Sequence, residues 1–254
     1  MIDAHAHLTD PRLANDLDDV LARATYAGVT RILSCGEDLP SSIANVAVAD
    51  RAPLIRVAVG VHPHRAASWD ASVAAGLRDL ARDERVVAIG EIGLDLSGRS
   101  APLEAQVRAF EGQLRLSLEV DLPVVVHLRD AGDQAREVID RVAGVRGMIH
   151  CFSEGPAQVA GWVARGFALS FAGTVTYPKS SAIQAAARLC PGERLLTETD
   201  SPYLAPQRHR GRRNEPAYVA ETLAAVAAAR GENTNQVETA VAASAKRLFG
   251  ARWG

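Results

Sequence analysis

The sequence contains few cysteines, almost no lysine and no long hydrophobic run. Its three cysteines are an odd number and form no CxxC pair, which argues against a disulfide framework and against a thiolate metal site. No apolar stretch approaches the roughly 20 residues that a membrane-spanning helix needs. Polar residues interrupt the first ten positions, so we expect no signal peptide, no membrane association and a cytoplasmic location.

The shortage of lysine accompanies a near balance of charge. Only two of the 28 basic residues are lysines, Lys179 and Lys246, and the formal net charge is −2. This charge provides no broad basic surface that would wrap a long nucleic acid. Any nucleic-acid substrate would therefore be held locally, by a metal ion and a few arginines.

Short apolar runs alternate along the chain with longer segments of helical period. The candidate strands read MIDAHAHL, VTRILSCG, LIRVAVGV, VVAIGEIG, LPVVVHLR, GMIHCFS, FALSFAG and RLLTETD. Apolar residues that recur every three to four positions predict helices over 15–27, 68–82, 103–119, 158–165, 216–230 and 236–249. This alternation favours an α/β fold, a (β/α)8 TIM barrel with extra C-terminal helices, as a single domain over residues 1–254. An open doubly wound sheet is the alternative, but no Gly-rich phosphate loop follows the first strand.

Polar residues gather where the predicted strands end, which is where a barrel builds its active site. Six of the seven histidines lie there, and only His209 lies in a loop: the six are His5, His7, His62, His64, His127 and His150. Other strand ends carry the acidic residues Glu91, Asp95, Glu198 and Asp200. Because strand residues alternate between faces, His5 and His7 share one face. Two unpaired imidazoles are costly against the outer helices, so we expect both to point into the barrel mouth.

Imidazole and carboxylate without thiolate form the donor set of hydrolytic metal sites. Each histidine taken alone is more often a hydrogen-bonded core or rim residue, but the convergence of several strand ends favours ligands. The candidates are His5, His7, Glu91, His127, His150 and Asp200. Six donors exceed the three protein ligands of a typical catalytic zinc, whereas two divalent ions (Zn, Mg or Mn) about 3.5–4 Å apart would use them all. Glu91 is the expected bridge, since neither lysine lies on a predicted strand to serve as a carboxylated bridge.

Eight segments carry a family resemblance: IDAHAHL, GVHPH, IGEIGLD, LPVVVHLRDA, IHCFS, SFAGTVT, LLTETDSPYLAP and RGRRNEP, from residue 2 to about residue 219. Together they resemble the TatD family of metal-dependent deoxyribonucleases, within the amidohydrolase-like barrels. The resemblance implies that His5, His7 and Asp200 hold one metal and that His127 and His150 hold the other, with Glu91 shared. The chain departs from the family pattern in the loop Leu-Ser-Gly-Arg at 96–99, where two aromatic residues and an arginine are usual. It departs again at Glu154, which stands before the glycine of the HCFSG motif.

The chemistry implied is metal-assisted hydrolysis of a phosphodiester, with a water whose pKa is lowered toward ~7. Glu91, Asp200 and His62 are the candidate catalytic residues. Asp200 could act as both ligand and proton acceptor, and Glu198, on the same face, could orient a ligand imidazole. His62 is either a phosphate contact or proton donor, or a structural loop histidine.

Candidate substrate contacts are His62, His64, Arg129, Arg210 and Arg213. Arg129 could reach a phosphate or pair with Asp130, and the basic loop 208–213 could steer an anion or simply be solvated. Tyr177 and Tyr203 could stack a base or pack at the rim.

The ligand residues do not by themselves identify the bond that is cleaved. We expect trimming of DNA ends or short single strands, because a broad basic face is lacking, and no obligate protein partner. Hydrolysis of an aminoacyl ester of the D-aminoacyl-tRNA type, or of a cyclic amide, is the alternative on the same two metals. A barrel that binds metal without catalysis is a third possibility, against which the complete ligand set argues.

Overall fold

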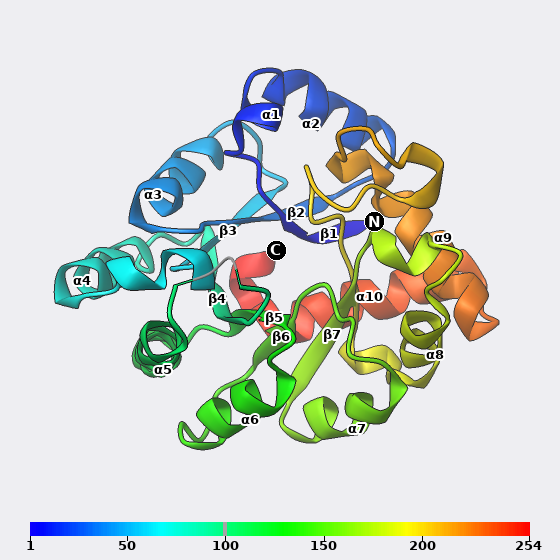
Figure 1. Cartoon of the computed structure of the whole chain (residues 1–254). Coiled ribbons are helices and arrows are strands. Elements are labelled where there is room, and N and C mark those ends of the chain that lie inside the picture. The colour runs from blue at the N-terminus through cyan, green and yellow to red at the C-terminus, as the bar shows by residue number, and fades with distance from the viewer. Residues whose placement is uncertain (99–100) are drawn as a thin grey trace.

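The computed structural model describes residues 1–98 and 101–254, so Arg99 of the divergent loop lies outside the described residues. Eight strands form one parallel sheet in the order of the sequence, from β1 to β8. A bridge between Ala6 and Ser201 brings the first strand beside the segment that follows the last, and helices surround the sheet (Figure 1). The predicted (β/α)8 TIM barrel with additional C-terminal helices is confirmed.

The strands are β1 (Ile2–Ala6), β2 (Arg31–Cys35), β3 (Ile55–Val59), β4 (Val86–Asp95), β5 (Val124–Arg129), β6 (Gly147–Ile149), β7 (Phe167–Phe171) and β8 (Leu195–Thr197). The α-helices are α1 (Pro11–Ala14), α2 (Leu17–Tyr26), α3 (Leu39–Val48), α4 (Ala71–Leu80), α5 (Leu103–Glu119), α6 (Gly132–Asp140), α7 (Pro156–Ala164), α8 (Ser181–Leu189), α9 (Val219–Arg230) and α10 (Thr234–Phe249). The 3-10 turns are η1 (Pro63–Ser68), η2 (Gly173–Thr176), η3 (Gly192–Arg194), η4 (Gln207–His209), η5 (Pro216–Tyr218) and η6 (Gly250–Trp253).

The helix expected over 15–27 forms as α2, Leu17–Tyr26, and a short helix that was not expected precedes it. Asp10 caps a separate short helix, α1, whose first residue is Pro11. The second helix, α2, begins only after Asp16, whose φ of −132° and ψ of 34° lie outside the helical region. Asp16 pairs with Arg213 from a distant loop, at 2.6 Å. A tertiary contact therefore accompanies the boundary between α1 and α2, two residues after the start that helical periodicity predicts.

Some other helices begin or end at different residues than expected, and three helices were not predicted from the sequence. The helix expected over 216–230 starts as the turn η5 and becomes α-helical at Val219. Helices α3, α6 and α8 complete the units between strands, and each has only nine or ten residues. Short segments contain few repeats of the 3.6-residue period, so their pattern is weak in the sequence.

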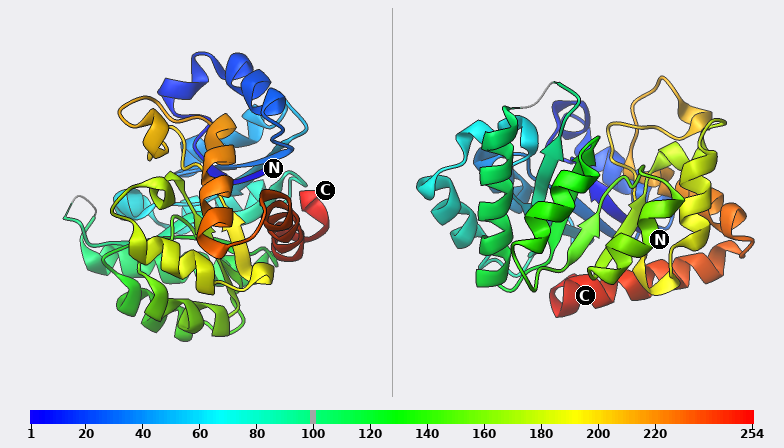
Figure 2. Two further views of the ribbon diagram at one scale, coloured as in Figure 1. Left: turned by 90° about the vertical axis from the view of Figure 1, so that its right-hand side faces the viewer. Right: turned by 60° about the horizontal axis from the view of Figure 1, so that its bottom comes forward.

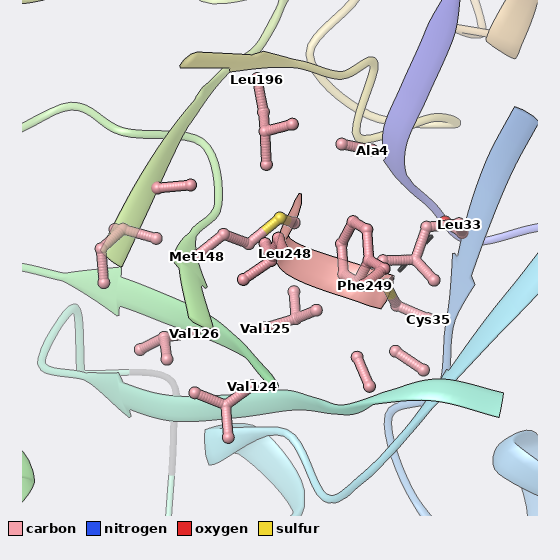
Figure 3. Close-up of a cluster of buried hydrophobic side chains, with 14 of the residues drawn as sticks. Ala4, Leu33, Cys35, Val124, Val125, Val126, Met148, Leu196, Leu248 and Phe249 are labelled. Carbon is pink, nitrogen blue, oxygen red and sulfur yellow. Dashed lines mark hydrogen bonds between the residues drawn. The ribbon is translucent and has the colours of Figure 1, made fainter. Parts of the chain in front are cut away.

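The last long helix, α10, closes one end of the barrel (Figure 2). A capping box formed by Asn233 starts it, and Leu248 and Phe249 near its end belong to the buried core. These two side chains lie among residues of several strands, including Leu33, Cys35, Val125, Met148 and Leu196 (Figure 3). Apolar packing fills the interior of the barrel at this end, so the buried histidines of the predicted site lie toward the opposite end. Among residues 1–98 and 101–254, no helix has the length and hydropathy of a membrane span.

Replacing Phe249 with alanine should destabilise the barrel, because the side chain is 4% exposed in the core. A buried phenylalanine truncated to alanine costs about 3–5 kcal/mol of free energy of unfolding, which urea denaturation followed by circular dichroism measures. Lys246→Ala, at an exposed position of the same helix, is the matched control and should change stability by no more than about 0.5 kcal/mol. Equal effects of the two substitutions would contradict a role for Phe249 in closing the barrel.

Candidate metal centre

The six predicted metal ligands meet at the carboxyl ends of the strands. They are His5 of β1, His7 just after it, Glu91 of β4, His127 of β5, His150 after β6 and Asp200 after β8. Five of them are buried, and the side chain of His127 is 18% exposed. The imidazoles of His5 and His7 both turn toward Glu91 rather than toward the outer helices.

His5, His7 and Asp200 form one group of donors with an oxygen of Glu91. The Nε2 atoms of His5 and His7 lie 3.2 Å apart, and they lie 3.7 and 3.4 Å from Oδ1 of Asp200. Oε2 of Glu91 lies 3.3 Å from His5 and 3.6 Å from His7. Ligand atoms about 2.1 Å from a tetrahedral zinc lie about 3.4 Å from one another. These four atoms therefore have the spacing of ligands that share one ion.

His127 and His150 form a second group around the other oxygen of Glu91. Oε1 of Glu91 lies 2.8 Å from Nδ1 of His127 and 2.8 Å from Nε2 of His150. The two nitrogens are 3.1 Å apart. Glu91 thus presents one carboxylate oxygen to each group, as a carboxylate that bridges two ions must do.

Each histidine of the second group has a carboxylate on the side of its ring that faces away from Glu91. Oδ2 of Asp95 lies 3.3 Å from Nε2 of His127, and Oε1 of Glu198 lies 3.2 Å from Nδ1 of His150. An N–H donated to each carboxylate leaves the lone pair of the opposite ring nitrogen facing Glu91. Glu198 lies where the sequence predicts an orienting partner. The sequence did not predict that Asp95 orients His127, because its place at a strand end was the only indication of a role in the site.

His62 faces Glu91 but is oriented as a hydrogen-bond donor. Its Nδ1 accepts the backbone N–H of His64 at 3.1 Å, so the proton of the neutral ring is on Nε2, 3.5 Å from Oε1 of Glu91. Burial lowers the pKa of His62 to about 3 although the charge of Glu91 opposes this, so the ring is neutral at pH 7. His62, Glu91 and His127 are close enough to share an ion, but a protonated nitrogen has no lone pair to offer one.

The electrostatics of the cluster centre on the charge of Glu91. Burial raises the pKa of this carboxyl, but the surrounding imidazoles, with the charge of His150 as the largest contribution and a hydrogen bond with His127, outweigh burial and hold the pKa well below its usual range. Burial lowers the pKa of His7, but its hydrogen bond to Asp200 and the charge of Glu91 raise the pKa to about 9. The buried carboxylates thus attract positive charge, which a divalent cation supplies in place of protons. Imidazole nitrogens and carboxylate oxygens without thiolate suit zinc, manganese or magnesium.

Two predicted substrate contacts lie beside this cluster. Nε2 of His64 lies 3.1 Å from Oδ2 of Asp95, and the His64 side chain is 42% exposed. Arg129, at the end of β5, is exposed. Within the described part of the chain its guanidinium has no carboxylate within 4 Å, so the alternative pairing with Asp130 is not formed.

The two predicted arginines of the loop 208–213 have different environments. Arg213 binds the carboxylate of Asp16 at 2.6 Å and donates to the carbonyl of Arg12 at 2.6 Å, so it anchors the loop beside α2. Arg210 is exposed and lies over the ring of Tyr177, 4.6 Å from the centroid. Of the two side chains, Arg210 is the one oriented to meet an anion in solvent.

A second arginine–tyrosine pair adjoins the first metal group. The ring of Tyr203 meets that of His7 edge to face, with centroids 5.8 Å apart, and Tyr203 is 41% exposed. The guanidinium of Arg12 lies over Tyr203, 4.3 Å from the centroid, while Asp10 binds Arg12 at 2.7 Å. Sequence reasoning named Tyr203 but missed Arg12, because nothing in the local pattern brings residues so far apart together.

The inserted acidic residue Glu154 does not face the metal centre. Its carboxylate accepts a hydrogen bond from Nε1 of Trp162 and lies 3.6 Å from Arg136. These contacts tie Glu154 to α6 and α7, so its charge serves packing between the outer helices.

Along almost its whole length the chain is similar to proteins of one family. A model of the TatD related DNase family matches residues 2–250. The 3'-5' ssDNA/RNA exonuclease TatD of Klebsiella pneumoniae (strain 342) is 37% identical, with 98% of each chain covered. The uncharacterized metal-dependent hydrolase YabD of Bacillus subtilis (strain 168) is 34% identical, again with 98% of each chain covered. The crystal structure of YjjV, a TatD homolog from Escherichia coli K12, superposes with a TM-score of 0.93 at 29% identity, covering 99% of this chain and 98% of that one.

Replacing Asp95 with asparagine should weaken metal binding at the second group, because His127 loses the carboxylate that orients it. Loss of such a partner typically lowers metal affinity by about 10–100-fold. Titration calorimetry of the metal-stripped protein with Zn²⁺ or Mn²⁺ measures the change. Asp79→Asn, on the exposed face of α4, is the control; an Asp95→Asn variant that bound metal as tightly as this control would contradict the orienting role.

Proposed function

The chain belongs to the TatD-related family of metal-dependent deoxyribonucleases, and from this membership we propose that it trims the ends of single-stranded DNA by hydrolysing phosphodiester bonds. It is a metal-dependent hydrolase acting on ester bonds. The proposal rests on the position of the Glu91 carboxylate, whose two oxygens face two separate groups of donors. A phosphodiester needs charge neutralised on both sides of the phosphorus, which a bridged pair of ions provides.

The two ions of this proposal are divalent, and zinc, magnesium and manganese all suit the donors. His5, His7 and Asp200 would hold one ion, His127 and His150 the other, and Glu91 both. When bound, such ions lower the pKa of water toward ~7 and neutralise phosphoryl charge. The carboxylates behind His127 and His150 keep the ligand nitrogens aimed at the site without rearrangement.

Two side chains are suited to proton transfer. Burial raises the pKa of Asp200, but the hydrogen bond with His7 and the charges of the neighbouring histidines together outweigh burial and lower the pKa. The carboxylate is therefore ionised and able to accept a proton from attacking water. His62 holds a proton on Nε2 at neutral pH, because burial disfavours its charged form and His64 occupies Nδ1. His62 therefore donates a hydrogen bond to a phosphoryl or leaving oxygen.

The rim of the site supplies groups for a short unpaired strand. The exposed Tyr203 and the arginine over it lie next to His7, and Arg210 over Tyr177 forms a similar pair. Aromatic and guanidinium planes bind unstacked bases without sequence preference. Arg129 and His64 are exposed at the second metal group and would contact the backbone, while Arg213 would hold the loop that carries Arg210.

Replacing Glu91 with glutamine should abolish hydrolysis while keeping the shape of the side chain. Removal of a residue that orients a metal ligand typically lowers activity by up to about 100-fold. The loss of activity in Glu91→Gln should be larger, because both metal groups lose the carboxylate that they share. Release of nucleotides from 3'- or 5'-labelled linear single-stranded DNA measures activity. Glu104→Gln, at an exposed position of α5, is the control. Circular DNA, RNA, aminoacyl-tRNA and a cyclic amide are tested in parallel. Circular DNA degraded as fast as linear DNA would rule out trimming of ends.

Replacing Tyr203 with alanine should raise KM for single-stranded DNA while leaving hydrolysis of a small phosphodiester, bis-p-nitrophenyl phosphate, nearly unchanged. Stacking of one base contributes about 1–3 kcal/mol, so KM should rise by about 5- to 140-fold. Tyr203→Phe keeps the ring and loses only the 3.3 Å hydrogen bond to Asp10, so it should retain the low KM. Loss of activity on both substrates in Tyr203→Ala would instead indicate damage to the metal group at His7.

A further inference from the structure

A cavity of about 590 Å³ opens at the end of the barrel opposite the metal centre. Figure 2 shows the C-terminal segment η6 lying at this end. The cavity lies between η6, the start of β3 and the segment that leads into β4, and four of its lining residues are arginines: Arg56, Arg82, Arg85 and Arg252. A volume of this size is within the range of small-molecule sites, about 300–1,000 Å³.

Two of these arginines donate to main-chain carbonyls and not to carboxylates. Nε of Arg56 donates to the carbonyl of Arg252 at 2.6 Å, and its Nη1 donates to the carbonyl of Pro53 at 3.0 Å. Nη1 of Arg252 donates to the carbonyls of Ala81 and Val86, each at 2.9 Å. Over the described ranges, neither guanidinium has an Asp or Glu carboxylate within 4 Å, and Nη2 of each makes no hydrogen bond within the chain.

The other charged residues of the cavity are partly neutralised. Arg85 pairs with Asp83 at 2.6 Å and also with Asp50. Arg82 lies 3.6 Å from Asp79, and both side chains are more than 70% exposed, so this pair contributes little. Glu84 is the one acidic residue of the lining. Within the described ranges, the guanidinium groups of the lining without a carboxylate within 4 Å are thus those of Arg56 and Arg252, and Arg82 is only weakly paired.

A structural role alone does not account for this arrangement. Arg56 and Arg252 fasten η6 beneath the barrel, but neutral donors could hold main-chain carbonyls as well. Burial and the nearby charge of Arg31 lower the pKa of Arg56, so its charge costs free energy that an anion would recover. Arg82 holds nothing in place.

We propose that this cavity binds the phosphate group of a small phosphate-bearing anion, at Arg56, Arg252 and Arg82. Planar guanidinium groups bind phosphate oxygens through paired, charge-assisted hydrogen bonds. Ala49, Pro53, Ile55 and Ala251 form a less polar wall for the rest of such a ligand. Inorganic phosphate and a nucleoside monophosphate share this chemistry. The proposal does not depend on the proposed nuclease activity, since none of these residues belongs to the metal centre.

Calorimetric titration of the metal-stripped, full-length protein tests the proposal. The ligands are inorganic phosphate, a nucleoside 5'-monophosphate, the same nucleoside without phosphate, and sodium chloride at matched ionic strength. Both phosphates should bind in a saturable manner with one ligand per chain, and the nucleoside and chloride should not. Tighter binding of the monophosphate than of phosphate would place its organic part against the less polar wall. Equal affinities would assign the site to phosphate alone, and either result supports the proposal.

Three variants decide where the anion binds. Arg82→Ala should weaken binding by about tenfold, as expected for loss of one charge-assisted contact, without lowering the melting temperature. Arg56→Met keeps the apolar part of the side chain and should weaken binding at least as much. Arg108→Ala, exposed on α5, should bind normally, as should Glu91→Gln. The proposal is overturned if neither phosphate binds, if Arg82→Ala binds like Arg108→Ala, or if Glu91→Gln removes the binding.

Discussion

The structure of the site depends on one buried carboxylate, Glu91, held among imidazoles at the mouth of the barrel. A buried charge without partners would cost several kcal/mol. Here one oxygen faces His5 and His7, and the other faces His127 and His150. The arrangement requires β1, β4, β5 and the ends of β6 and β8 to be held in register around one point, which closure of the barrel achieves.

The orienting groups turn this convergence into a site with defined proton positions. Asp95 and Glu198 each stand behind a histidine and leave its other nitrogen free toward Glu91. At His62 the nitrogen that faces Glu91 carries the proton instead of the lone pair, because Nδ1 accepts the backbone N–H of His64. Histidines that look alike in the sequence thereby differ in which ring nitrogen carries the proton and which carries the lone pair.

The two ends of the barrel have separate chemistry. At the carboxyl ends of the strands lie imidazoles, carboxylates and the arginine–tyrosine pairs of the rim. At the opposite end Leu248 and Phe249 of α10 fill the interior, and arginines fasten η6 below them. The abundance of arginine over lysine fits both ends, since guanidinium groups stack on rings and hold several acceptors at once.

The sequence by itself determined the eight strand–helix units and the six ligand candidates. Apolar strands repeat at regular intervals, and strand ends in a parallel barrel must meet at one face. Only the tertiary structure decided which carboxylate stands behind which histidine and that Nδ1 of His62 accepts the backbone N–H of His64. It also decided that Arg213 pairs with Asp16 and that Arg12 lies over Tyr203. These contacts join residues distant in the sequence through side-chain geometry, and periodicity carries information about which face a residue occupies but not about its partner there.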